Sequence, residues 1–128
     1  MAAHPNQAAN MAYTDGFIIA VPNANRQEFI DYASRFDTIF LEFGATRVVE
    51  CWADDVPAGK QTDFQRSVKA TDDESVVFSW VEWPDKATRD AGMKKMMEDP
   101  RMDDTKPMPF DGARMIFGGF VPVVDLKA

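Results

Sequence analysis

The chain has little of the chemistry on which most catalytic sites depend. Its 128 residues include one histidine, His4, close to the N-terminus, and one cysteine, Cys51. A Ser-His-Asp or Cys-His arrangement needs an imidazole held against the nucleophile, and a structural zinc site needs several soft ligands at defined spacing. Neither can be assembled beyond residue 12, so we predict no metal site and no cofactor, and we assign no catalytic residue.

Long apolar runs and positive net charge are also missing. No run reaches the about 18 apolar residues that read as a membrane span, and the N-terminus lacks the basic start and apolar segment of a signal peptide. One cysteine cannot form an internal disulfide, which agrees with a reducing compartment. The formal charge of −7 disfavours polyanionic partners. We expect a cytoplasmic protein that binds neither nucleic acid nor membrane.

The chain does contain enough apolar side chain for a core. It is 45% hydrophobic and 12% aromatic, and its length fits one domain. Residues 1–12 are small and polar and show no periodicity, so we interpret them as a disordered extension. Residues 13–128 are then the single folded domain.

The first half of that domain predicts a strand followed by a helix. Residues 13–22 are rich in aromatic and β-branched side chains and end on a proline, which is typical of a strand. A helix capped by Asn23 or Asn25 then runs to about Phe43, and Gly44 supplies a left-handed C-terminal residue. Apolar positions recur every three or four residues along it: Phe29, Ala33, Phe36, Phe40 and Phe43.

The second half predicts two strands, a helix and a last strand. Strands at about 45–53 and 75–83 flank a long polar connection, and a second helix opens at Pro84 and stops before Pro100. A last strand at about 114–124 contains two adjacent glycines, which suggest a bulge or a close backbone approach. The resulting β-α-β-β-α-β order predicts an α+β fold of the ferredoxin-like kind, an antiparallel sheet with both helices on one face.

The predicted strands are apolar on both sides. In 75–83, Phe78 and Trp80 alternate with Val77 and Val81, although a sheet with one solvated face should alternate apolar with polar residues. Two helices cover only one face, and an exposed apolar sheet is an aggregation hazard. We therefore predict a homodimer packed sheet to sheet, the dimeric α+β barrel.

Five segments carry a family resemblance: YTDGFIIAVP (13–22), ECWADDVPAGKQTDF (50–64), DESVVFSWVEW (73–83), RDAGMKKMMEDPRM (89–102) and MPFDGARMIFGGF (108–120). Together they resemble the YbaA-like family of uncharacterised bacterial proteins. The resemblance implies a dimeric α+β barrel and no established activity. Gly92 departs from the expected pattern, because a glycine within a helix costs about 1 kcal/mol relative to alanine; a close helix contact is one reason for it.

Polar and charged residues are concentrated in the long connection and around the MPFD segment. If a ligand site exists, we expect it at Asp54, Asp55, Lys60, Trp80, Asp111 and Arg114. Carboxylates beside cations tune each other's proton affinity, as acid-base chemistry requires, yet Asp-rich loops are more often solvated turns and helix caps. Core and dimer packing is the competing interpretation of Trp80, and Cys51 is expected to be a small buried hydrophobe.

Three functions fit these patterns. The first is a homodimeric small-molecule-binding or accessory protein that uses a cavity between the first helix and the sheet. The second, by analogy of fold alone, is a cofactor-independent monooxygenase-like enzyme acting on an aromatic or other apolar small molecule. The third is a structural or partner-binding dimer without a cavity. A pocket carboxylate with a raised pKa, for example Asp54 or Asp55 beside Trp80 or Arg114, would favour the enzyme.

Overall fold

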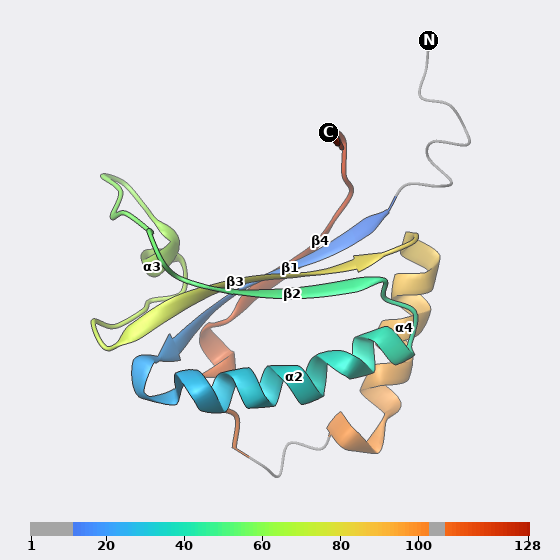
Figure 1. The fold of residues 1–128 in the computed structure, drawn as a ribbon, viewed down its shortest axis with the longest axis horizontal. Helices are drawn as coiled ribbons and strands as arrows, with labels where there is room; N and C mark the ends of the chain where they lie inside the picture. Colours follow the sequence, from blue (N-terminus) through green and yellow to red (C-terminus); the bar gives the residue numbers. More distant parts are fainter. Residues whose placement is uncertain (1–11, 103–106) are drawn as a thin grey trace.

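The strands and the two long helices follow the predicted β-α-β-β-α-β order, and the short helix α3 lies between β2 and β3 (Figure 1). The computed structural model describes residues 12–102 and 107–128, so the predicted extension 1–12 lies, except for Ala12, outside the described residues. The elements are β1 (Tyr13–Pro22), η1 (Asn23–Asn25), α2 (Arg26–Glu42), β2 (Arg47–Trp52), α3 (Phe64–Ser67), β3 (Glu74–Trp83), α4 (Lys86–Glu98), η2 (Pro100–Met102), η3 (Gly112–Arg114) and β4 (Ile116–Phe120).

The four strands form one antiparallel sheet in the order β2-β3-β1-β4. The central strands β1 and β3 pair along their full length, from Tyr13 opposite Trp83 to Pro22 opposite Glu74. Both long helices, α2 and α4, lie on the same side of this sheet (Figure 1). The predicted ferredoxin-like α+β arrangement is therefore confirmed. Within the described ranges, none of the helices has the length and apolarity needed to cross a membrane.

Helix α2 is held to the sheet by the apolar stripe that its sequence predicts. Phe29, Ala33 and Phe40 on this stripe are buried, and their spacing places them on one side of a helix. The helix ends just before Gly44, whose φ of 115° lies in the left-handed region that favours glycine. The first predicted helix thus has nearly the expected bounds.

Helix α4 approaches the rest of the core closely at Gly92. The helix begins after Asp85, whose carboxylate accepts a hydrogen bond of 2.7 Å from the Thr88 amide. A Cβ atom on Gly92 would lie 2.6 Å from the Phe43 carbonyl oxygen and 2.7 Å from the Trp83 ring. The close contact suggested for this mid-helix glycine is therefore present.

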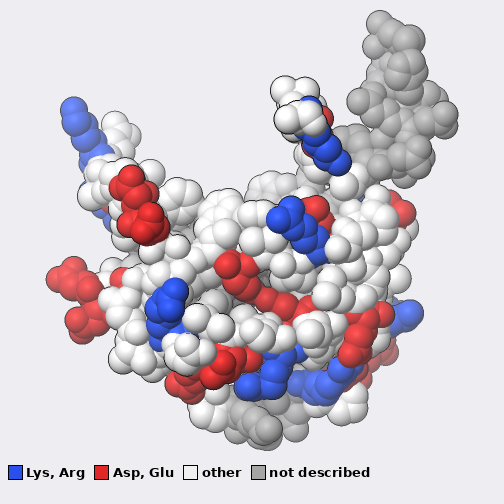
Figure 2. Space-filling model, in the orientation of Figure 1, with Lys and Arg blue, Asp and Glu red and all other residues white. Residues whose placement is uncertain are grey.

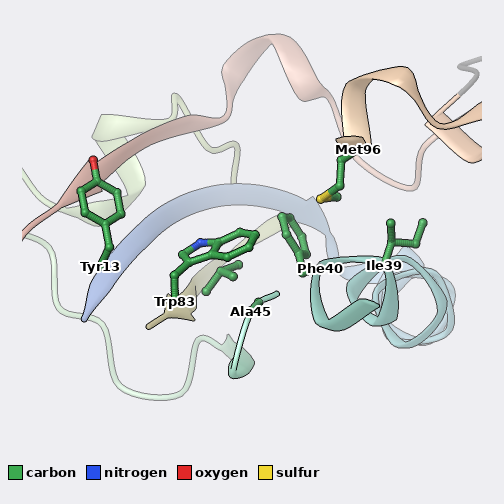
Figure 3. Packing of buried hydrophobic residues seen from close by; sticks show 7 residues of the cluster. Tyr13, Ile39, Phe40, Ala45, Trp83 and Met96 are labelled. Carbon is green, nitrogen blue, oxygen red and sulfur yellow. The ribbon is translucent and has the colours of Figure 1, made fainter. Parts of the chain in front are cut away.

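Trp83 lies at the centre of the largest buried cluster, shown in Figure 3. Its side chain is 0% exposed, and its ring meets Phe40 edge to face with centroids 6.3 Å apart. Tyr13 and Met96 complete this cluster from β1 and α4. This cluster therefore joins both helices to the central strands.

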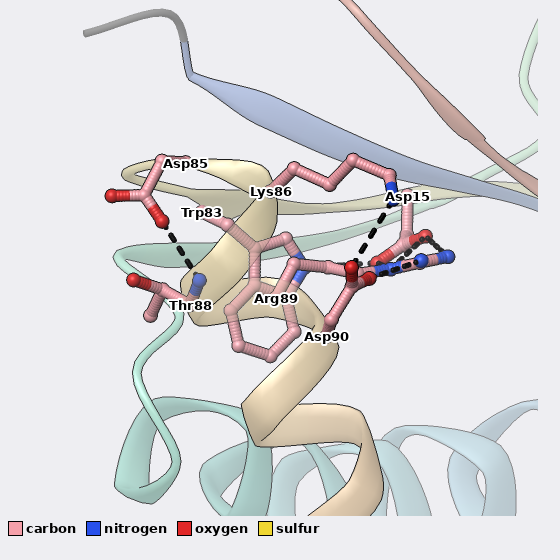
Figure 4. A network of polar contacts seen from close by, with 7 residues as sticks. All are labelled: Asp15, Trp83, Asp85, Lys86, Thr88, Arg89 and Asp90. Carbon is pink, nitrogen blue, oxygen red and sulfur yellow. Dashed lines mark hydrogen bonds and ion pairs between the residues drawn. The ribbon is translucent and has the colours of Figure 1, made fainter. Parts of the chain in front are cut away.

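A buried carboxylate next to Trp83 ties α4 to β1 (Figure 4). Asp15 is 3% exposed and accepts a 2.9 Å hydrogen bond from Trp83 Nε1. The guanidinium of Arg89 donates to both oxygens of the same carboxylate, and it also lies over the Tyr13 ring at 5.1 Å from the centroid. The buried charge is thus paired and hydrogen-bonded, as burial requires.

The last strand is shorter than predicted. Strand β4 spans Ile116–Phe120, whereas the sequence predicts about 114–124. Its pairing with β1 runs without a bulge, since Gly118 lies opposite Gly16 in continuous register. A Cβ on Gly119 would lie 2.7 Å from the Tyr13 ring, so of the two readings of the glycine pair the close approach is the correct one.

Candidate functional site

A cavity of about 280 Å³ lies between the helices and the sheet. Its walls are mainly aromatic and thioether side chains from α2, α4, the central strands and the segment before β4. The phenylalanines and methionines that line it are Phe17, Phe29, Phe36, Phe40, Phe110, Phe117, Met93, Met96, Met97, Met102, Met108 and Met115. Such walls favour an apolar occupant, and the unbranched methionines adapt readily to its shape.

Two carboxyl groups interrupt this apolar lining. Asp37 of α2 and Glu50 of β2 both line the cavity and share a side-chain hydrogen bond. Burial, the hydrogen bond to Glu50 and the nearby Glu50 charge raise the pKa of Asp37 from 3.8 to about 9. A hydrogen bond between two carboxyl groups needs a proton, so Asp37 is protonated at neutral pH.

One oxygen of this pair is closed off from solvent. Glu50 Oε1 is buried and has no hydrogen-bond partner among the described residues. Buried acceptors are normally paired, and protonated Asp37 is the neighbouring donor.

The carboxyl pair also borders the outside of the molecule. Asp37 and Glu50 line a second hollow of about 540 Å³ between α2 and β2, together with Arg26 and Trp52. The Arg26 guanidinium lies over the Trp52 ring at 5.4 Å from the centroid. The pair therefore lines both the cavity and a surface groove.

The predicted residues of the long connection lie elsewhere. Asp54, Asp55 and Lys60 are exposed, and none is among the described residues that line the cavity. Asp63 organises this connection by accepting hydrogen bonds from the amides of Arg66 at 2.7 Å and Gly59 at 3.1 Å. The structure therefore separates the connection from the carboxyl pair.

Asp111 and Arg114, by contrast, are brought together. Arg114 donates one hydrogen bond of 3.0 Å to Asp111 and two hydrogen bonds of 2.7 and 2.6 Å to Glu74. This guanidinium holds the pKa of Glu74 at about 2. The same guanidinium donates to the Lys69 carbonyl at 2.9 Å, so Arg114 fastens the turn before β4 to the start of β3.

Trp80 lies on the sheet face opposite the helices. Its indole donates to Glu82 at 2.8 Å, and its ring meets Phe78 edge to face at 5.8 Å. Trp83, three residues on, is in the core on the helix side, so the two tryptophans point in opposite directions. Trp80 is also among the residues that border the internal cavity.

The face of the sheet that carries Ile18, Phe78, Trp80, Ile116 and Phe120, here called the open face, is largely apolar. Phe120 is 62% exposed, and a groove of about 580 Å³ follows these residues. Figure 2 shows the molecule hollowed on this side, between the connection after β2 and the C-terminal segment.

The exposure of Cys51 differs from the expectation. The sequence predicts a small buried hydrophobe, yet the cysteine is exposed and free. It lies on edge strand β2 opposite Phe78 in register, so its side chain points to the open face. Burial of Cys51 therefore depends on what covers that face.

A pattern-based signal for the carboxyl pair was present in the sequence. Asp37 follows Ala33 by four residues and precedes Phe40 by three, so it falls on the apolar stripe of α2. Glu50 alternates with Val48 and Trp52, which places it on the helix side of β2. A charged residue at a core position of each element was the clue.

The described ranges 12–102 and 107–128 contain no ready set of metal ligands. Within them, no three His, Cys, Asp or Glu side chains are grouped in a way that could hold a metal ion. The carboxyl pair has two members and shares a proton.

Comparison with known proteins supports the family resemblance. The family model described as "Protein of unknown function (DUF1428)" matches residues 12–112. The "Uncharacterized protein YbaA" of Escherichia coli K12 is 53% identical over 116 residues, covering 90% of this chain and 99% of the relative, and the protein of that name from Shigella flexneri gives the same values.

A solved structure supports the fold. A dimeric ferredoxin-like protein from an uncultured marine organism superposes with a TM-score of 0.61 at 10% sequence identity, over 91% of this chain and 99% of the other. At this identity the likeness concerns the fold alone. On the family match and the 53% identity, the chain belongs to the DUF1428 family, and the resemblance to YbaA-like proteins is confirmed.

Proposed function

We propose that this protein binds a small apolar molecule in the cavity between α2 and the sheet. The observation that carries the proposal is the cavity itself: about 280 Å³ of space with an almost entirely apolar lining and one pair of carboxyl groups. Ligand sites typically combine apolar walls with a few polar groups that orient the ligand. The volume is at the lower end for such sites, so the ligand is about the size of one substituted ring.

We further propose that the protein works as a homodimer joined through the open face. Exposed Phe78 and Phe120 give this face an apolar surface that water solvates poorly. The C-terminal segment supports the same proposal, because Val123 and Leu126 are each 87% exposed. A second copy of the chain would cover both, and the similar marine protein is described as dimeric. Asp54, Asp55 and Lys60 would then lie beside the interface.

Native mass spectrometry of protein purified from its own host tests both proposals. We expect a dimer that retains a stoichiometric small molecule. Ala33→Phe should fill the cavity and release this molecule, because Ala33 is a buried wall residue, whereas the exposed neighbour change Ser34→Ala should retain it. Phe78→Glu should give monomers. A wild-type monomer would refute the dimer, and a dimer that neither carries nor takes up small apolar molecules would refute the ligand site.

One observation favours a second candidate, the enzyme. A cavity carboxyl with a raised pKa was the feature expected of an acid-base catalyst, and Asp37 has that feature in place of Asp54 or Asp55. The test is turnover of the molecule released from the native protein, followed by oxygen uptake and product analysis. Turnover lost in Asp37→Asn would support the enzyme, and an unchanged molecule would leave a binding protein.

A further inference from the structure

We infer that residues 121–126, here called the C-terminal arm, pack into the groove on the open face of a second copy of the chain. The inference rests on the proposed homodimer, because it assumes that two open faces meet. It adds the segment that each subunit contributes to its partner. Three observations support it: the apolar surface of the arm, the side on which it leaves the sheet, and the groove that lies beside it.

The arm has an apolar surface that its own subunit does not cover. Four of its six residues are large, apolar and exposed: Val121, Val123, Val124 and Leu126. Single exposed apolar residues are ordinary, but several gathered in one short segment mark a surface that another molecule covers. The arm therefore has the composition of a contact segment.

The arm leaves the sheet on the side of the open face. Strand β4 ends at Phe120, and Pro122 follows two residues later. A proline has no N–H to donate, so Pro122 does not extend the ladder with β1. The C-terminal segment then runs away from α2 and α4 (Figure 1) and stands clear of the rest of the surface (Figure 2). The arm thus enters the space that a subunit on the open face would occupy.

The groove on the open face offers a matching apolar surface. Gly16 and Gly118 face each other in register and leave part of its floor without side chains, while Phe78 and Trp80 are among its walls. Its volume of about 580 Å³ is in the range of sites that hold small molecules, so it has room for several aliphatic side chains. None of the described residues 121–128 lines it. Arm and groove therefore do not meet within one subunit.

A second copy is the occupant that both features favour. Two copies related by a two-fold axis would each place an arm on the groove of the other, so a single interface covers both apolar surfaces twice. The charge of the arm agrees with this, because Asp125 is its one charged residue. The arm thus brings little of the net charge of −7 against an identical, equally acidic partner.

Variants of the full chain measure how much the arm contributes to the dimer. Leu126→Asp should raise the dissociation constant at least about tenfold, because it removes a buried leucine and places a charge in an apolar groove. The neighbouring change Asp125→Asn should stay within about threefold of the wild type. Analytical ultracentrifugation at several concentrations measures both constants. Leu126 is exposed within one subunit, so the substitution should leave the circular dichroism spectrum unchanged.

Cross-linking identifies the chain that the arm touches. The photo-crosslinker p-benzoylphenylalanine replaces Leu126, and this protein is equilibrated with a large excess of isotopically heavy wild type, so that most variant subunits pair with a heavy one. Mass spectrometry after irradiation and digestion identifies the joined peptides. We expect the light arm to be joined to heavy peptides from β1, β3 or β4.

The outcomes separate the inference from the proposed dimer. A wild-type monomer would overturn both. An unchanged dissociation constant in Leu126→Asp would overturn the inference alone, and the dimer would stand. The absence of a light-to-heavy cross-link at the open face would also overturn the inference, because the arm would then lie on its own chain or elsewhere on the partner.

Discussion

Arg89 of α4 holds the buried carboxylate of Asp15 through Nη2 at 2.8 Å and Nε at 3.1 Å. The two residues are 74 positions apart in the chain, so this pair joins the second helix to the first strand. Trp83 donates to the same carboxylate from β3. The Asp15 side chain thus joins β1, β3 and α4 (Figure 4).

The first prediction concerns this pair. Asp15→Ala should lower the free energy of unfolding by about 3 kcal/mol, because it leaves the Arg89 charge and the Trp83 N–H without their acceptor in a largely buried place. Urea unfolding followed by tryptophan fluorescence measures the loss. Asp90→Asn removes the exposed partner of Arg89 and should cost much less. Equal losses in the two variants would contradict the assigned role of Asp15.

The second prediction is a pH dependence caused by Asp37. Its pKa is raised in the folded state from 3.8 to about 9, so the folded protein holds a proton that the unfolded chain releases over this interval. Its contribution to stability is therefore complete below pH 3.8 and is lost as the pH rises toward 9. Asp37→Asn should flatten the fall of Tm with rising pH, as measured by thermal unfolding. The exposed variant Glu28→Gln should retain the wild-type slope.

The third prediction has the opposite sign and concerns Glu74. Arg114 lowers the pKa of this carboxylate from 4.5 to about 2. Its contribution to stability is present above pH 4.5 and is lost as the pH falls toward 2. Glu74→Gln should reduce the acid dependence of unfolding in urea titrations at successive pH values. The exposed change Asp54→Asn serves as control, and an unchanged acid slope in Glu74→Gln would argue against the clamp.

The fourth prediction concerns the close helix contact. Gly92→Ala should destabilise the fold by about 1–3 kcal/mol through overpacking, although alanine favours a helix by about 1 kcal/mol. The added Cβ would meet the Phe43 carbonyl and the Trp83 ring, neither of which can move freely. Ala91→Gly, at the exposed neighbouring position, should lose only the propensity difference. Stabilisation by Gly92→Ala would show that α4 is free to shift outward.

The fifth prediction uses Cys51 as a reporter of the proposed dimer. The thiol lies on the open face opposite Phe78, so a second subunit should shield it. We expect slow modification by a thiol reagent in the wild type and at least about tenfold faster modification in Phe78→Glu, if that variant is monomeric. Dilution of the wild type should raise the rate in the same way. A rate independent of both changes would place the interface elsewhere.

Much of the fold could be predicted from local patterns. The apolar stripe through Phe29 and Phe40 predicts a helix because its period is that of a helix, and Gly44 ends it because a left-handed residue suits glycine. The bounds of β4 were harder to predict from the sequence. Residues 112–114 have strand-compatible neighbours but form a turn capped by Asp111, whose carboxylate accepts from the Ala113 amide at 3.0 Å.

The candidate site was accessible only in part. The predicted Asp111 and Arg114 meet, but they form a clamp with Glu74. The cavity pair was missed, because Asp37 and Glu50 lie on different elements and only the packing of α2 on β2 brings them together.

The sequence by itself determined the order of the elements, the antiparallel α+β class and the two-sided apolar sheet, since these follow from periodicity, glycine and proline. The tertiary structure alone decided which carboxyl groups meet and how deeply they are buried. Packing of α2 on β2 brings Asp37 against Glu50 and partly removes both from water, and this partial desolvation raises the pKa of Asp37. A proton affinity of this kind depends on distance and burial, which are properties of the folded chain.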